Sequence, residues 1–234
     1  MPFSNKLVLV TGGAGVLGRA VVAWFSERGA RVAVLDYSED ILRQAFPEPA
    51  GNHSYLTCEL TNKESCVKAV GDLMRQFDKV DVLANIAGGF LMGDPVHETS
   101  NETWDFLFDL NARSIMNMST AVVPGMIQRS SGKIVNVAAR AATAGVANMG
   151  AYTASKAAVM RLTEAMAMEL REQNINVNAV MPSLIDTPRN REDMPDADFD
   201  KWVKPEQLAG IIGFLTSKES DAIHGACIPV DGLS

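Results

Sequence analysis

The chain has 234 residues, of which 47% are hydrophobic and 21% charged, and its formal net charge is −7. A chain of this length and composition is typical of one globular domain with a large core. The negative charge argues against nucleic acid or an anionic membrane surface as a partner, and the apolar runs are shorter than the ~18–20 residues of a membrane span.

The first residues and the metal-binding residue types indicate a cytoplasmic protein without a metal site. Residues 1–6 lead directly into a strand-like run and contain neither a secretory signal nor a transit-peptide composition. The three cysteines form no C-x-x-C pair, and the three histidines are scattered along the sequence. We therefore expect reduced cysteines that serve mainly in packing, and no metal ligands.

A glycine-rich turn follows the first apolar run. The run at 6–11 resembles a strand buried on both faces, and a helical pattern begins directly after the turn. The turn contains G-x-G-x-x-G, in which glycines let backbone N–H groups approach a pyrophosphate at the N-terminus of a helix. A glycine-rich turn without a ligand is the alternative. The residues expected to contact a dinucleotide are Gly12, Gly13, Gly15, Val16, Leu17 and Gly18.

The second strand-like run, 31–35, ends at Asp36, close to the expected ~20 residues beyond the last glycine of the motif. A carboxylate at this place accepts hydrogen bonds from a ribose 2′-OH and repels a 2′-phosphate. No lysine or arginine lies between Thr11 and Val16 to receive such a phosphate. The sequence therefore predicts NAD as the cofactor, with NADH preferred over NADPH.

The rest of the chain continues to alternate strand and helix patterns. Pro124 and Gly125 are expected to bend or interrupt the helix that begins near 99. The polar, proline-marked segment 182–203 is expected to be irregular and to form a lid over the site. The alternation predicts one α/β domain, residues 1–234, with a doubly wound parallel sheet of Rossmann type and helices on both faces. Further strands are expected at 54–58, 80–85, 133–138, 176–181 and 226–230, and further helices from 61, 99, 151 and 206.

In a sheet of this kind the ligand lies at the carboxyl ends of the strands. The glycine turn, Asn85, the residues after Ala138 and those after Pro182 each follow a predicted strand. Four separate features are therefore expected to meet at one edge of the sheet and to form one site.

Tyr152 and Lys156 lie four residues apart in a stretch with helical spacing, so that both side chains can face the same cleft. A nearby cation favours the ionised form of a phenol, whose reference pKa is ~10. The pair is thus suited to general acid/base catalysis by Tyr152 near neutral pH. The alternative is a tyrosine and a lysine that merely share an exposed helix face.

Taken together, these motifs resemble the short-chain dehydrogenase/reductase family along essentially the whole chain. The resemblance rests on Thr11–Gly18, Asn85-Ile86-Ala87-Gly88, Asn111, Tyr152-x-x-x-Lys156 and the stretch from Pro182 to Thr187. It implies hydride transfer on a nicotinamide ring, a small-molecule substrate, and a homodimer or homotetramer.

The resemblance also implies a role for each matching residue. Tyr152 would donate or accept the proton, Lys156 would bind the nicotinamide ribose and lower the pKa of Tyr152, and Asn111 would support a proton-relay water. Thr187 would lie near the carboxamide of the cofactor. Cofactor contacts are likewise implied for Asn85, Ala87, Gly88, Pro182 and Ile185.

Three positions depart from the common family pattern. Glycine is at Gly15 instead of at Val16, Ala139 stands where the family usually has a serine, and Ser183 stands where it often has a glycine. The first two departures are shared by the quinonoid dihydropteridine reductases, which the chain also resembles at 87–90, 139–142 and 186–202. Asn111 and the surroundings of Lys156 resemble the general family instead.

Ala139 bears on the substrate, because a missing hydrogen-bond donor to a developing oxyanion typically costs ~10²–10³ in rate. Either Ser155, Thr143 or Asn148 replaces the donor, or the substrate is activated and does not need it. Three functions therefore stay open. They are an NAD(H)-dependent oxidoreductase for a small carbonyl, alcohol or C=N substrate, a quinonoid dihydropteridine reductase, and an NAD-binding sensor or scaffold with weak catalysis.

Overall fold

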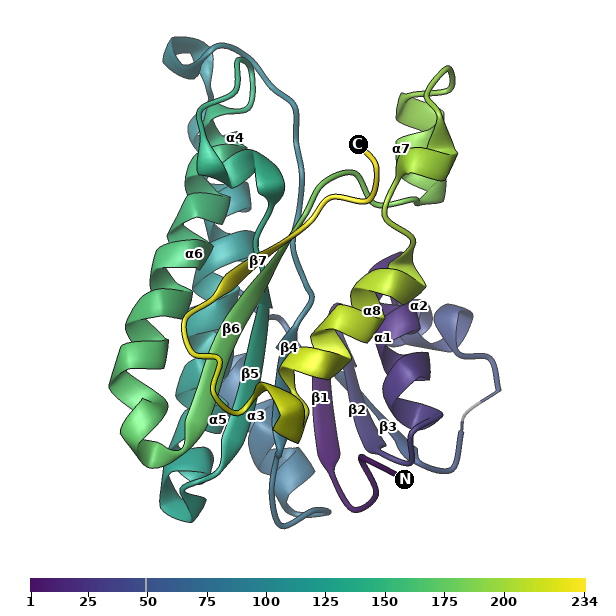
Figure 1. Ribbon diagram of the computed structural model, residues 1–234, viewed down its shortest axis with the longest axis vertical. Helices are drawn as coiled ribbons and strands as arrows, with labels where there is room; N and C mark the ends of the chain where they lie inside the picture. Colours follow the sequence, from purple (N-terminus) through teal and green to yellow (C-terminus); the bar gives the residue numbers. More distant parts are fainter. Residues whose placement is uncertain (49) are drawn as a thin grey trace.

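A computed structural model describes residues 1–48 and 50–234 of the chain. Seven parallel strands form one sheet in the order β3-β2-β1-β4-β5-β6-β7 (Figure 1). The strand order reverses between β1 and β4, and such a reversal opens a crevice at the carboxyl edge of a parallel sheet. The strands are β1 Leu7–Thr11, β2 Arg31–Asp36, β3 His53–Thr57, β4 Val82–Asn85, β5 Gly132–Val137, β6 Ile175–Pro182 and β7 Cys227–Val230.

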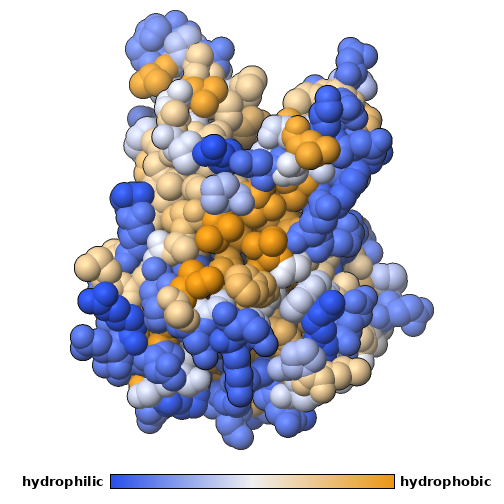
Figure 2. All heavy atoms as spheres, viewed as in Figure 1, coloured by the Kyte–Doolittle hydropathy of each residue, from blue (hydrophilic) through white to orange (hydrophobic). Residues whose placement is uncertain are grey.

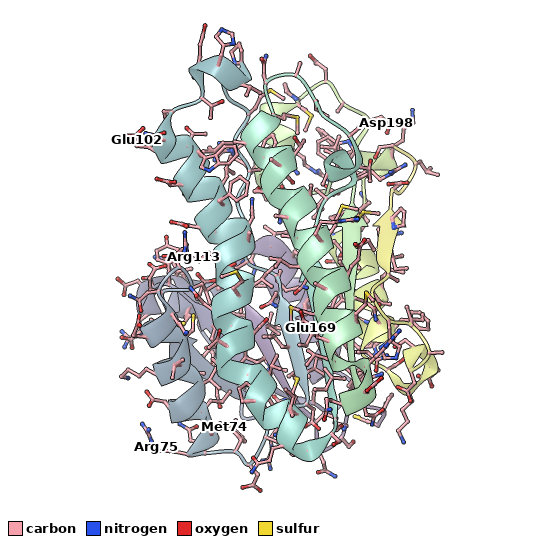
Figure 3. The ribbon with its side chains drawn as sticks, turned by 90° about the vertical axis from the view of Figure 1, so that its left-hand side faces the viewer. Met74, Arg75, Glu102, Arg113, Glu169 and Asp198 are labelled. Atoms are coloured by element: carbon pink, nitrogen blue, oxygen red, sulfur yellow. The ribbon has the colours of Figure 1, made fainter. Side chains whose placement is uncertain are left out.

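Helices cover both faces of this sheet, as Figures 1 and 3 show from two sides. Helices α1 and α8 pack against each other on one face, and α3, α5 and α6 cover the other. The doubly wound parallel fold expected from the alternating pattern is therefore confirmed. The helices are α1 Val16–Ser26, α2 Glu39–Ala45, α3 Lys63–Met74, α4 Asn101–Phe108, α5 Ser114–Arg129, α6 Gly150–Leu170, α7 Pro188–Asp193 and α8 Pro205–Leu215.

The central strand β1 serves two hydrophobic cores at once. Val8 and Val10 pack in the core under α1 and α8, whereas Leu7 and Leu9 pack in the core under α3 and α5. Successive side chains of a strand point to opposite faces, so a strand with helices on both sides needs a continuous apolar run. This requirement explains why the run at 6–11 shows no alternation of polar and apolar residues.

The helix expected from residue 99 is interrupted at a different place from the one that Pro124 suggested. A π-helical turn, Asp109–Arg113, separates α4 from α5, and α5 continues through Pro124. Proline removes one hydrogen bond within a helix, but α5 buries Val122 and Met126 on either side of Pro124. Tertiary packing of this apolar face outweighs the local preference of one residue. Of the bend or interruption expected at Pro124, the interruption does not occur.

The segment 182–203 is more regular than expected. It contains α7 and a short 3-10 turn, Phe199–Lys201, and a parallel bridge joins Ile185 to Val203. Thr187 caps α7 by accepting a hydrogen bond from the Asn190 backbone N–H at 3.2 Å. In Figure 1 the segment stands apart from the upper ends of α4 and α6, across the carboxyl edge of the sheet.

Among the described residues, no helix has both the length and the apolar character needed to cross a membrane.

Candidate active site

The carboxyl edge of the sheet is hollowed. Figure 2 shows a wide notch there between two projections of the surface. One projection contains the upper ends of α4 and α6, and the other contains α7 (Figures 1 and 2). The glycine turn, Asp36, Asn85 and Pro182 all lie at the carboxyl ends of strands and therefore meet along this edge.

The glycine turn has no room for side chains at three of its positions. Gly12 has a φ of +61°, and a Cβ on it would lie 2.8 Å from the Ala87 Cα atom. A Cβ on Gly18 would overlap the Gly12 carbonyl oxygen, and one on Gly13 would overlap the Val34 side chain. These glycines allow the turn to pass between β1, β4 and α1 at backbone contact distance.

The start of α1 is suited to bind an anion. Its N-cap residue, Gly15, offers no side-chain cap, and the first turn contains no acidic residue. The N–H groups at the N-terminus of an α-helix have no partner within the helix and carry a partial positive charge. Gly15 is exposed, and Val16 and Leu17 are half-buried beside it. The turn therefore fits the pyrophosphate of a dinucleotide, for which this geometry is the usual binding site.

Asp36 lies directly beside this turn. One carboxylate oxygen accepts a hydrogen bond from the Ala14 N–H at 3.0 Å, and the other accepts one from the Tyr37 N–H at 2.9 Å. The carboxylate thus joins the end of β2 to the glycine turn and stays at the edge where a ribose would lie. Each carboxylate oxygen can accept further hydrogen bonds, so the contact is compatible with the expected role in binding a 2′-OH.

The end of β4 is held from both sides by polar side chains. The Thr11 hydroxyl accepts hydrogen bonds from the N–H groups of Ile86 and Ala87 at 3.1 and 3.2 Å. The Asn85 amide donates to the Asn136 side chain at 2.8 Å, and Asn136 donates to the Thr163 hydroxyl at 2.9 Å. The Asn85 side chain therefore lies in a buried chain of hydrogen bonds that runs from β4 to α6.

Asn111 lies in the π-helical turn and makes three side-chain hydrogen bonds, two to Gly89 and one to Ser155. Its side-chain oxygen accepts a hydrogen bond from the Gly89 N–H at 2.8 Å, and its amide donates to the Gly89 carbonyl at 3.0 Å. The same amide donates to the Ser155 hydroxyl at 2.9 Å. A Cβ on Gly88 would lie 2.9 Å from both Asn111 Oδ1 and Lys156 Nζ. The structure thus brings Gly88, Asn111 and Lys156 together at one point.

Tyr152 and Lys156 share one face of α6 but differ in their contacts. The Lys156 ammonium is buried and donates to the Val137 carbonyl at 2.8 Å. Burial lowers the pKa of Lys156 to about 8 and raises the pKa of Tyr152 to about 12. The raised pKa of Tyr152 comes from desolvation of the phenol, and the expectation that Lys156 lowers this pKa stays a prediction.

Ala139, which is 4% exposed, stands at the carboxyl end of β5. Two of the three donors that might replace a serine there are occupied elsewhere. The Ser155 hydroxyl is buried and donates to the Tyr152 carbonyl at 2.8 Å, and the Thr143 hydroxyl donates to the Arg140 carbonyl at 2.9 Å. Asn148 lies in a left-handed backbone conformation and is exposed.

The predicted cofactor contacts after β6 lie at the base of α7. Pro182 is the last residue of β6, and the Ile185 carbonyl accepts a hydrogen bond from the Asn190 side chain at 2.8 Å. Ser183 is held by the C-terminal residues, because its hydroxyl donates to the Asp231 carbonyl at 2.7 Å. Thr187 caps α7, so its hydroxyl oxygen already accepts one backbone hydrogen bond.

Several contacts of this site join residues whose proximity no motif predicts. The contacts of Thr11, Asn136 and Thr163 depend on strand neighbours that the sequence does not specify. Phe90 packs its ring against that of Tyr152, with ring centroids 4.9 Å apart, although the two are far apart in sequence. Within residues 1–48 and 50–234, no three His, Cys, Asp or Glu side chains are grouped to hold a metal ion.

Comparison with known proteins is consistent with this geometry. The family model for short chain dehydrogenases matches residues 6–198. A cyclopentanol dehydrogenase of Comamonas testosteroni is 34% identical, with 98% of this chain and 96% of the relative covered. An NAD-dependent glycerol dehydrogenase of Listeria innocua is 34% identical, with 98% and 93% covered. A 3-oxoacyl-acyl-carrier-protein reductase of Thermotoga maritima is 32% identical, with 99% and 98% covered.

Solved structures show the same fold over the whole chain. NAD⁺-bound xylitol dehydrogenase superposes with a TM-score of 0.91 at 27% identity, with 99% of this chain and 100% of that chain covered. ElxO with NADP bound gives 0.90 at 25% identity, with 97% of each chain covered. Both nicotinamide cofactors thus occur on this fold. The chain belongs to the short-chain dehydrogenase family and is an NAD(P)-dependent oxidoreductase.

Proposed function

We propose that the protein is an NAD(H)-dependent oxidoreductase that interconverts a small alcohol and its carbonyl compound, or reduces a C=N bond, with Tyr152 as the general acid and base. The observation that carries this proposal is that Gly88 and Asn111 meet Lys156 of the Tyr152 helix, next to the place where the glycine turn contacts Ala87. When bound, the nicotinamide ring supplies or accepts the hydride.

The residues of the chain would divide the remaining work. The Tyr152 phenol exchanges a proton with the substrate oxygen or nitrogen at the carboxyl edge of the sheet. Lys156, held by the Val137 carbonyl, places a cation where a ribose hydroxyl would approach. The glycine turn and the start of α1 hold the pyrophosphate, Asp36 holds the adenosine ribose, and Thr187 lies toward the carboxamide. The segment 182–203 forms the lid.

The test is steady-state oxidation of NADH with a panel of cyclopentanone, a 3-oxoacyl thioester and a quinonoid dihydropteridine. Tyr152→Phe should lower turnover of the best substrate by ~10²-fold or more, because the proton donor is lost, while the Kd for NADH changes little. Tyr55→Phe is the matched control, because Tyr55 lies on β3 and its hydroxyl contacts His53. If Tyr152→Phe kept most of its activity, the role assigned to Tyr152 would be wrong.

A specific observation also supports the second candidate, a quinonoid dihydropteridine reductase. Ala139 offers no donor, and the Ser155 and Thr143 hydroxyls are bonded elsewhere. A substrate that regains aromaticity on accepting hydride needs less stabilisation of a developing oxyanion. The same panel separates the candidates. A preference for the pterin by ~10²-fold or more over cyclopentanone favours the reductase. Comparable rates favour a general alcohol dehydrogenase or carbonyl reductase, and absence of turnover favours a sensor or scaffold.

A further inference from the structure

Phe90 covers the ring of the proposed catalytic tyrosine. The two rings meet edge to face, with centroids 4.9 Å apart and planes at 89°. This arrangement is the preferred contact of two aromatic rings and stabilises their mutual orientation. Phe90 is itself 49% exposed, so its ring contacts Tyr152 while about half of the residue stays open to solvent.

The backbone next to Phe90 is fixed by Asn111. Gly89 both donates to and accepts from the Asn111 side chain, at 2.8 and 3.0 Å. A Cβ on Gly89 would lie 3.0 Å from the Leu110 side chain and 3.1 Å from the Phe106 ring, so this backbone lies directly against the helix. The backbone from which the Phe90 side chain extends is therefore held in place.

The same asparagine is joined to the backbone of Tyr152. Its amide donates to the Ser155 hydroxyl at 2.9 Å, and that hydroxyl donates to the Tyr152 carbonyl at 2.8 Å. Asn111 is 1% exposed and Ser155 is fully buried, so water does not compete for these bonds. Both amide hydrogens of Asn111 are used in this arrangement. Phe90 and Tyr152 are therefore connected in two ways. Their rings are in contact, and their backbones are linked through Gly89, Asn111 and Ser155.

We propose that Phe90 is a positioning residue, held by the Asn111–Gly89 contact, which orients the Tyr152 phenol and shields it from water. The catalytic meaning of this inference rests on the proposed role of Tyr152. Phe90, on the loop after β4, offers the phenol an apolar neighbour, and Ala139, just after β5, offers no donor. The phenol would then be the main proton donor that a substrate meets.

The charged groups near this part of α6 leave desolvation as the main influence on the phenol. Burial is the cause of the raised pKa of Tyr152, and Lys156 donates to a backbone carbonyl. From the elements packed against α6 here, Arg140 pairs with Asp231, and Asp109 pairs with Arg113. Glu102 and Asp105 of α4 are exposed to water, which screens their charge.

The experiment measures tyrosinate absorbance near 295 nm against pH. Each protein is compared with its own Tyr152→Phe version, so that the difference reports Tyr152 alone. Phe90→Ala should lower the pKa of Tyr152 by at least about one unit, because water then reaches the phenol. Signal should appear below pH 11 in this variant and be small in the wild-type protein, with circular dichroism confirming that both are folded.

Two variants complete the design. Phe90→Trp keeps an aromatic ring and should restore the wild-type titration. Phe214→Ala removes a phenylalanine of nearly the same exposure, 45%, from α8, and should leave the titration unchanged. An unchanged pKa in Phe90→Ala, or an equal shift in Phe214→Ala, would overturn the inference. The titration needs no substrate, so it tests Phe90 independently of turnover. An unchanged pKa together with loss of turnover in Tyr152→Phe would overturn only the role of Phe90. A shifted pKa together with full turnover in Tyr152→Phe would overturn only the catalytic role of Tyr152.

Discussion

Lys156 is held in a place that disfavours its charge. Its pKa is lowered from 10.5 to about 8 by burial, so between these two values the unfolded chain binds more protons than the folded one. Stability therefore rises with pH across this window. Below pH 8 the full penalty applies, and two and a half pKa units correspond to about 3 kcal/mol. The residue is thus kept at a cost in stability, which is common for functional groups.

We expect Lys156→Met to be more stable than the wild-type protein at pH 7 and to lose this advantage as the pH approaches 10. Urea unfolding at pH 7, 8, 9 and 10 measures the difference. The series ends at pH 10 because the raised pKa of Tyr152 makes stability fall with increasing pH only between 10.0 and about 12. Lys63→Met, at an exposed position of α3, is the control. A difference that does not depend on pH would contradict this account of Lys156.

Asp36 should decide the choice of cofactor. We expect NADH to bind more tightly than NADPH, because a 2′-phosphate would lie against the carboxylate. Asp36→Asn keeps an acceptor for the Ala14 N–H but removes the charge. It should lower the ratio of the NADPH Kd to the NADH Kd by roughly tenfold, equivalent to about 1.4 kcal/mol. Fluorescence titration at low salt gives both Kd values. Glu39→Gln, three residues further on and paired with Arg43, is the control. Equal or tighter binding of NADPH to the wild-type protein would refute the assignment.

At the scale of single elements, short-range patterns predicted more than long-range ones. The strand and helix at 6–25 follow from local periodicity and glycine geometry, and β3 begins one residue earlier than expected. The π-helical turn at Asp109–Arg113 has no comparable signal, because it is held by contacts of Asn111 with Gly89 and Ser155, which are 22 and 44 residues away. The burial that raises the pKa of Tyr152 likewise has no signal in the sequence, because spacing shows the nearby lysine but not the desolvation of the phenol.

One carboxylate, that of Asp186, makes several of the contacts that hold the segment 182–203. Asp186 accepts two hydrogen bonds from Arg191 at 2.6 and 2.8 Å and one from Lys204 at 2.8 Å. These cations hold the pKa of Asp186 well below its ordinary value. The stabilisation that the Asp186 carboxylate gives the folded chain is therefore fully present above the ordinary pKa of 3.8. It is lost as the pH falls toward the lowered pKa. Asp186 thus joins the start of α7 to the start of α8.

Asp186→Asn should loosen this segment without unfolding the sheet. Trypsin cleavage after Arg189, Arg191 and Lys201 should become several-fold faster, because local opening exposes the backbone. The urea midpoint of the whole protein should change much less. Asp193→Asn is the matched control, since Asp193 pairs with Arg189 within α7 and does not reach Lys204. Equal cleavage rates in the two variants would show that the carboxylate of Asp186 does not hold the segment.

At the scale of the whole molecule, the two cores share the strands of one sheet. Val8 and Val10 belong to one core and Leu7 and Leu9 to the other, so neither core can be lost while β1 stays ordered. The sequence predicted this arrangement because alternating βαβ units permit few other topologies. The side-chain partners that fix the site, such as the Asn85–Asn136–Thr163 chain, arise only when the strands are in register.

Shared strands predict that residues 1–234 unfold as one cooperative unit, and three tryptophans test this in different places. Trp24 lies between α1 and α8 against Gly213, Trp104 stacks on Phe108 of the helix before the π-helical turn, and Trp202 is buried after the 3-10 turn. Three variants that each keep one tryptophan, with phenylalanine at the other two positions, should give fluorescence midpoints in urea that match far-UV circular dichroism of the same variant. Saturating NADH should raise both midpoints together, since it binds only the folded chain. If the Trp24 variant lost its fluorescence signal at a lower urea concentration than its circular dichroism, the layer of α1 and α8 would unfold separately, and the single-domain assignment would have to be divided there.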